Sequence, residues 1–173
     1  MIKKILPFEE LFYRSQLSKQ DLLAHLENEI EAEKSFGFSA NNFSYSKPYV
    51  GKIYGNKFKI KRAINYRNSF LPIIKGEIKE DISGSKIIVK MSLVEFVKVF
   101  MIIWLGGAFI ACIAVTYNIL FNNGLNSEAG FFMLIPYGML LLGIAMAGFG
   151  FKVESKKSTQ DLEKILQAKI VER

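Results

Sequence analysis

The sequence predicts an α+β protein, with a cytosolic antiparallel sheet and covering helices, joined to a transmembrane hairpin of two helices. Two observations predict this fold class. Residues 99–121 and 129–151 form two uncharged, apolar runs separated by a short polar segment. The rest of the chain alternates between segments with the two-residue period of strands and segments with the spacing of amphipathic helices.

The two apolar runs are long enough to cross a membrane. At 1.5 Å per residue each helix would measure roughly 34 Å, against a hydrocarbon core of ~30 Å. Backbone amides in lipid must be paired internally, which favours helices for both runs. Asn122 to Glu128 is then the turn of an antiparallel hairpin. The alternative is two buried core helices of a soluble protein, which uncharged runs of this length disfavour.

Basic residues flank the hairpin on one side. They are Lys86, Lys90 and Lys98 before the first run, and Lys152, Lys156 and Lys157 after the second. The connecting turn has one acidic residue, Glu128, and no basic residue. Because positive charge is retained in the cytoplasm, we expect both termini there, in a multi-pass protein of a bacterial inner (cytoplasmic) membrane.

Small residues recur four positions apart in both apolar runs, as Gly107 with Ala111 and as Gly143 with Ala147. This spacing lets helix backbones approach closely. Two interpretations are open. The pairs pack the two helices of one hairpin together, or they join subunits of a homo-oligomer.

The chain before the first run begins with a predicted strand, Leu11 to Leu17. Ser18 then fits the N-cap of a helix, with Asp21 three residues later as in a capping box. An apolar stripe at helical spacing follows, and we expect the helix to end at Phe36-Gly37.

Four further segments have the composition and alternation of strands: 50–54, 57–64, 71–79 and 86–91. Gly55-Asn56 and Ser83-Gly84 are predicted turns. Strands joined in sequence order predict an antiparallel meander, with one face for a helix to cover.

Ser158 and Asp161, after the second run, repeat the capping pattern. Leu162, Ile165, Leu166 and Ile170 then form an apolar stripe. We expect an amphipathic helix within 152–173 that packs on a domain formed by 1–98, so that the hairpin at 99–151 interrupts one α+β domain. A helix lying in the lipid interface is the alternative, which its acidic residues disfavour.

Charge is unevenly distributed within the formal total of +7. Nine basic residues and no acidic one lie between Glu33 and Glu77, whereas five acidic residues and no basic one lie from Asp21 to Glu33. Lys57, Lys59 and Lys61 alternate along a predicted strand and therefore project from one face. The lysines either form a solvated face or contact anionic lipid headgroups, or they bind a small anionic ligand. Nucleic acid is disfavoured, because no aromatic–basic recognition motif accompanies them.

A polar segment, Tyr66-Arg67-Asn68-Ser69, separates two of the predicted strands. It is either a turn with satisfied side chains or part of a pocket. In the second case the binding residues would be Arg62, Tyr66, Arg67 and Asn68.

Catalytic chemistry finds little support in the sequence. The chain has one histidine, His25, and one cysteine, Cys112, which lies in the first apolar run. This excludes the usual zinc clusters and Cys–His nucleophile pairs. There is no Gly-x-Ser-x-Gly motif and no glycine-rich phosphate loop outside the apolar runs. We therefore expect no catalytic residues, no metal, no cofactor and no enzymatic activity.

The run Tyr66 to Pro72, followed by Gly76 and the double span, resembles small uncharacterised bacterial two-span membrane proteins with a cytosolic β-rich domain. The resemblance covers most of the chain and implies no activity. By architecture alone, the chain is also similar to bacterial proteins that join a pleckstrin-like domain to a membrane hairpin, in which the hairpin commonly comes first.

Two functional hypotheses follow. In the first, the cytosolic domain is a module that binds a ligand or a partner at the membrane, with anionic headgroups or a small anionic ligand as its target. In the second, several copies form a pore or a membrane-disrupting assembly, and the cytosolic domain acts as its trigger.

Overall fold

The computed structural model describes residues 7–32, 45–122 and 130–172. The chain forms two compact units. One combines Met1–Val94 with Gly150–Arg173 and is called here the α+β domain; the other, Glu95–Phe149, is called the apolar hairpin.

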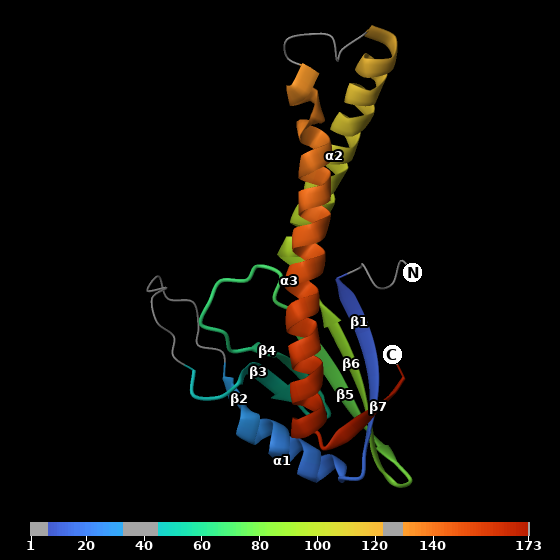
Figure 1. Cartoon of the computed structure of the whole chain (residues 1–173). Coiled ribbons are helices and arrows are strands. Elements are labelled where there is room, and N and C mark those ends of the chain that lie inside the picture. Colours follow the sequence, from blue (N-terminus) through green and yellow to red (C-terminus); the bar gives the residue numbers. More distant parts are fainter. Residues whose placement is uncertain (1–6, 33–44, 123–129, 173) are drawn as a thin grey trace. The chain divides into compact units, whose positions relative to one another are not determined.

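The α+β domain contains all the strands (Figure 1). Before the apolar hairpin the elements are β1 (Phe8–Ser15), α1 (Lys19–Glu29), β2 (Ile30–Ala32), β3 (Tyr49–Tyr54), β4 (Lys57–Arg62), β5 (Ile73–Asp81) and β6 (Gly84–Ser92). After the hairpin they are the last turns of α3 (Ile135–Ile165) and the strand β7 (Ala168–Glu172).

The strands form one seven-stranded sheet in the order β2-β3-β4-β5-β6-β1-β7. All neighbours pair antiparallel except β2 and β3, which are parallel. The predicted antiparallel meander is therefore confirmed as β3 to β6. The turn at Gly55-Asn56 is confirmed as well, because Tyr54 pairs with Lys57 and Gly55 has the positive φ of 58° that a tight hairpin turn requires.

Segments from both sides of the hairpin build this sheet. β1 lies between β6 and β7, so its pairing is completed by the strand that follows α3. Ser15 strengthens this junction, since its Oγ donates to the carbonyl of Leu166 at 2.9 Å. Residues 150–172 are thus an integral part of the domain.

Helices cover one face of the sheet, and no described helix of the α+β domain covers the other, which we call the open face. In Figure 1, α1 and the last turns of α3 lie on the same side of the strands. The core between them is apolar; its fully buried members include Leu11, Tyr13, Leu22, Leu26, Ile74, Ile87, Val89, Met91, Phe151, Leu162 and Leu166. Alternation along each strand places the remaining side chains on the open face.

The start of α1 is as predicted, but its end is not. Ser18 caps the helix: its Oγ accepts from the amide of Asp21 at 3.2 Å and donates to the Asp21 carboxylate at 2.6 Å. The helix ends at Glu29, and Ile30–Ala32 forms β2 beside β3. The expectation that it continues to Phe36-Gly37 is wrong, because pairing with β3 replaces the last turns; residues 33–44 lie outside the described ranges.

The C-terminal region differs from the prediction of a separate capped helix. α3 runs without a break from Ile135 to Ile165, and Ser158 is buried inside it. Gln167, with a φ of 44°, follows the helix, and the chain then enters β7. Ile170, expected on a helix, is a strand residue paired with Tyr13.

The apolar hairpin consists of α2 (Glu95–Asn122), a 3-10 helix (Gly130–Leu134) and the first turns of α3. Both helices are long and apolar enough to cross a membrane. Only 11% and 17% of their most apolar windows is buried, whereas the core helices of a soluble protein are mostly buried. Thr116 and Tyr137 join the two helices through their hydroxyl groups, at 2.7 Å.

We predict that Gly76→Ala destabilises the α+β domain. Gly76 in β5 pairs with Phe58 in β4, and a Cβ on Gly76 would fall within the Phe58 ring, which is 2% exposed. Overpacking of this kind costs about 1–3 kcal/mol. Thermal unfolding of the full chain in detergent, followed by circular dichroism of the sheet, should show a lower midpoint. Lys79→Ala, an exposed change on the same strand, is the control and should leave the midpoint unchanged.

Candidate functional site

Strand β4 divides the predicted binding residues between the two faces of the sheet. Its burial alternates, with Phe58 and Ile60 buried and Lys57 and Lys59 exposed. Arg62 lies on the same face as Phe58 and Ile60, and its side chain contacts Glu154 of α3. The lysines of β4 therefore project from the open face, and the structure does not bring them together with Arg62.

The open face carries a row of lysines in register across four strands. Lys52 in β3 pairs with Lys59 in β4, which pairs with Lys75 in β5, which pairs with Lys90 in β6. All four are exposed. Since neighbouring strands lie about 4.8 Å apart, these side chains are direct neighbours. We call Lys52, Lys59, Lys75 and Lys90 the lysine row.

One acidic residue compensates the lysine row at its β6 end. Lys90 forms an ion pair with Glu10 at 3.0 Å. Within residues 7–32, 45–122 and 130–172, Lys52, Lys59 and Lys75 have no ion pair. Like charges directly opposite one another destabilise a sheet. The row therefore holds unbalanced positive charge at β3, β4 and β5.

A hollow of about 390 Å³ lies at the β3–β4 end of the row, beside Lys52 and Lys59. Its lining includes Lys52, Lys59, Lys61, Tyr54, Val50, Ile73 and Val94. Positive charge and apolar surface thus meet in one concavity, which we call the lysine hollow. The sequence pattern indicated Lys59 and Lys61 on one strand, but it did not connect them with the other lining residues, which come from different strands and from the residues that follow β6.

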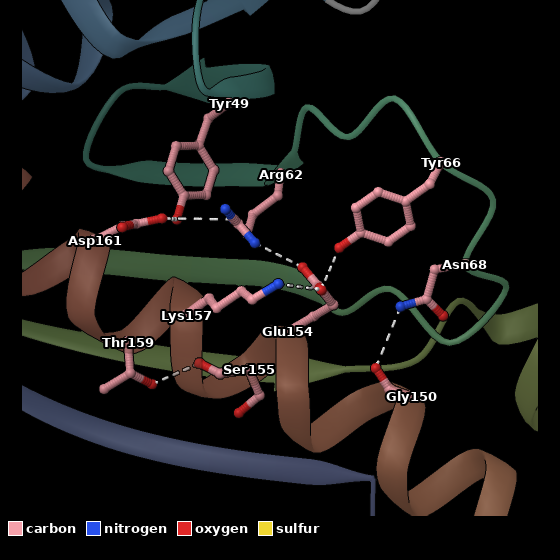
Figure 2. A network of polar contacts seen from close by, with 10 residues as sticks. All are labelled: Tyr49, Arg62, Tyr66, Asn68, Gly150, Glu154, Ser155, Lys157, Thr159 and Asp161. Atoms are coloured by element: carbon pink, nitrogen blue, oxygen red, sulfur yellow. Dashed lines mark hydrogen bonds and ion pairs between the residues drawn. The ribbon is translucent and has the colours of Figure 1, made fainter.

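The covered face contains a polar network centred on Glu154 of α3 (Figure 2). The Glu154 side chain is 2% exposed. Arg62 Nη1 lies 2.7 Å from its Oε2, and Lys157 Nζ lies 3.3 Å from its Oε1. The hydroxyl of Tyr66 also donates to Oε1. Three donors from β4, from the β4–β5 connection and from α3 itself therefore satisfy one buried carboxylate.

The network continues to both sides of Glu154. Arg62 Nε lies 3.5 Å from the carboxylate of Asp161, which also accepts a hydrogen bond of 3.3 Å from the hydroxyl of Tyr49. Asn68 donates to the carbonyl of Gly150 at 3.3 Å. Figure 2 shows these side chains aligned along α3. They attach β3, β4 and the β4–β5 connection to one helix.

A second buried carboxylate fastens α3 to β1. Glu9, whose side chain is 9% exposed, contacts Lys152 Nζ at 2.6 Å and accepts a hydrogen bond of 2.6 Å from Ser155 Oγ. Thr159, one turn further on, donates to the carbonyl of Ser155. Carboxylates with charged partners thus hold α3 to β4 through Glu154 and to β1 through Glu9.

The electrostatics agree with a satisfied network. Burial raises the pKa of Glu154, but hydrogen bonds from Tyr66, Arg62 and Lys157 outweigh it, so the pKa is lower than that of an ordinary glutamate. The same hydrogen bond to Glu154 raises the pKa of Tyr66. Burial, followed by the nearby Asp161 carboxylate, raises the pKa of Tyr49 well above its usual value.

Arg62, Tyr66 and Asn68 therefore serve as attachments for α3. Of the two interpretations of this segment, the contacts favour satisfied side chains over a pocket, because the polar groups of these three residues bind α3, and Arg67 is exposed. The sequence pattern did not indicate Glu154 and Asp161 as partners of Arg62, or Glu9 as the partner of Lys152. The one available signal was Glu154 itself, the single acidic residue among the lysines that follow the second apolar run.

The small-residue pairs have different surroundings within the apolar hairpin. Gly143 faces α2, where an added Cβ would lie 3.1 Å from Leu105 and 3.3 Å from Trp104. Ala147 is buried, whereas Gly107 faces open space and Ala111 is half-buried. Gly143 thus packs the two helices of one hairpin together.

Comparison with known proteins gives no family assignment: no protein-family model matches the chain, and no curated protein or solved structure is significantly similar to it.

We predict that Tyr66→Phe lowers the stability of the α+β domain by about 1–2 kcal/mol, because it removes a hydrogen bond to a buried carboxylate. Tyr54→Phe is the matched control, since Tyr54 is 61% exposed on the open face. Hydrogen–deuterium exchange of residues 150–165 should accelerate in the first variant only. Equal exchange in both variants would contradict the role assigned to Tyr66.

Glu154 also predicts a pH dependence. Its pKa is lowered in the folded state, so the stability it contributes is present above the ordinary glutamate value of 4.5 and is lost as the pH falls through the lower, folded value. Unfolding midpoints measured between neutral pH and about pH 3 should fall less steeply for Glu154→Gln than for the wild type. Glu163→Gln, elsewhere on α3, is the control and should follow the wild type.

Proposed function

We propose that the chain is an integral membrane protein of a bacterial inner membrane, and that its cytosolic α+β domain binds an anionic ligand or partner at the membrane. The observation that carries this proposal is the lysine row, which leaves unbalanced positive charge on the open face of a domain joined to the apolar hairpin. The proposal has two parts, the location of the domain and the chemistry of its open face.

The location is supported by the surface of the hairpin and by the flanking charges. Phe96, Ile102, Phe109 and Leu141 are among its many large apolar side chains that are more than half exposed. Such a surface is stable in lipid and is a liability in water. The lysines that flank the hairpin in the sequence favour the cytoplasm for the domain.

The chemistry of the open face is supported by what the covered face does with its charges. There, Arg62 and Lys157 are paired with Glu154, and Lys152 is paired with Glu9. On the open face, Lys52, Lys59 and Lys75 have no such partner within the described residues. Cations that repel each other across a sheet are relieved when an anion binds. An anionic target therefore fits this face best.

The location is tested by labelling with a membrane-impermeant maleimide in a bacterial host. In a Cys112→Ala background, Ser83→Cys reports on the exposed β5–β6 turn, and Ser127→Cys reports on the segment between the apolar helices. We expect Ser127→Cys to react in intact spheroplasts, and Ser83→Cys to react only in inverted vesicles. The reverse pattern, or recovery of the chain in the soluble fraction, would contradict the proposed location.

A further inference from the structure

We infer that the lysine hollow is a binding site for a phosphate-bearing ligand that also has an apolar part. The inference rests on the proposed function, because it specifies the anion that the open face binds. It adds Lys52, Tyr54, Val50, Ile73 and Val94 to the lysines found in the sequence. It also assigns the site to one end of the lysine row.

The cationic side of the hollow is formed by three lysines from two adjacent strands. Lys52 and Lys59 are directly opposite each other, and Lys61 follows two residues along β4 on the same face. A lysine ammonium is a compact point charge with three donors and binds phosphate in this way in many proteins. The flexible stems of these lysines allow their ammonium groups to converge on one anion above the hollow.

The other side of the hollow is apolar. Ile73 and Val94 line it with partly exposed side chains, above the almost fully buried Val50. Tyr54 contributes an aromatic ring beside the lysines. A volume of about 390 Å³ lies in the range of small-ligand sites, which combine apolar walls with a few charged groups. A bare inorganic ion would use the lysines alone. The lining therefore fits a phosphate ester whose organic group rests on the apolar wall.

The charge around the hollow favours an anion over longer distances as well. Among the described residues that line it, none is acidic. Lys75, the next member of the row, adds positive charge beside Lys59. Glu10 neutralises the distant end at Lys90, and Glu77, two residues from Lys75 on the same face, lies opposite Lys57. The excess of positive charge raises the local concentration of anions and their rate of association.

Two sources share this ligand chemistry: the headgroup of an anionic phospholipid and a free phosphate metabolite such as a nucleotide. Both present a phosphate ester next to a group that is less polar. The experiment is therefore arranged so that its arms distinguish a lipid from a soluble ligand.

The full chain is reconstituted in nanodiscs of phosphatidylcholine, and its lysines are mapped by brief acetylation and mass spectrometry. In one arm the soluble probe ATP is added. In the other arm part of the lipid is replaced by phosphatidylglycerol, with no ATP. We expect Lys52, Lys59 and Lys61 to become protected in at least one arm. Protection with ATP assigns a soluble ligand, and protection in phosphatidylglycerol assigns a headgroup.

The variants separate a built site from general attraction between charges. Lys52→Gln with Lys59→Gln should weaken the protecting interaction about tenfold, as judged from the ATP or lipid concentration needed to protect Lys61. Lys79→Gln with Lys86→Gln removes the same charge from exposed positions on the same face, outside the hollow, and should change it less than about twofold. Circular dichroism confirms that both variants keep the sheet.

Two results would overturn the inference: no protection in either arm, or an equal loss in both double variants. Neither result depends on the labelling experiment that tests the location of the domain. A cytosolic domain without protected lysines would remove the phosphate site and keep the location. Protected lysines on a domain found outside the cytoplasm would remove the location and keep the site.

Discussion

The ion pair between Arg62 and Glu154 is the interaction on which the α+β domain depends. Glu154 lies on α3, Arg62 lies at the end of β4, and their contact at 2.7 Å removes a carboxylate almost completely from solvent. A buried charge is tolerated only when its hydrogen bonds are satisfied, and loss of one partner costs far more than the pair contributes. Tyr66 and Lys157 supply the remaining donors. The position of α3 along the sheet is thereby fixed, and with it the start of β7.

Strand β4 carries two kinds of basic residue, one that is paired within the domain and others that are exposed to solvent. On the covered face the cation is an arginine, whose planar group contacts Glu154 and Asp161 at once. On the open face the cations are lysines, which are strongly hydrated and mobile. Burial costs less for the weakly hydrated guanidinium of arginine than for the ammonium of lysine, which favours arginine in the buried network and lysines in solvent. The same strand thus contributes to the stability of the domain and to its proposed binding face.

Much of the domain could be predicted from the sequence because its signals are local. Alternation predicted β3 to β6, the Gly55-Asn56 turn was recognisable from its residue types, and Ser18 marked the start of α1. The parts that were wrong depend on distant pairing. Residues 158–170 have an apolar spacing that suits a helix, but Ile170 is placed by β1, which lies far away in the sequence. The lysine row was hidden for the same reason, since register across four strands is not encoded in any one of them.

The position of β1 between β6 and β7 has a consequence for biosynthesis. A ribosome delivers β1 to β6 first, then the two apolar helices, and β7 last. Until β7 emerges, one edge of β1 has no strand beside it, and the covered face lacks α3. The domain therefore cannot mature while the apolar segments are still being synthesised. Its completion therefore requires that both apolar helices and β7 have been made, and an arrest before β7 leaves an exposed strand edge of the kind that aggregates.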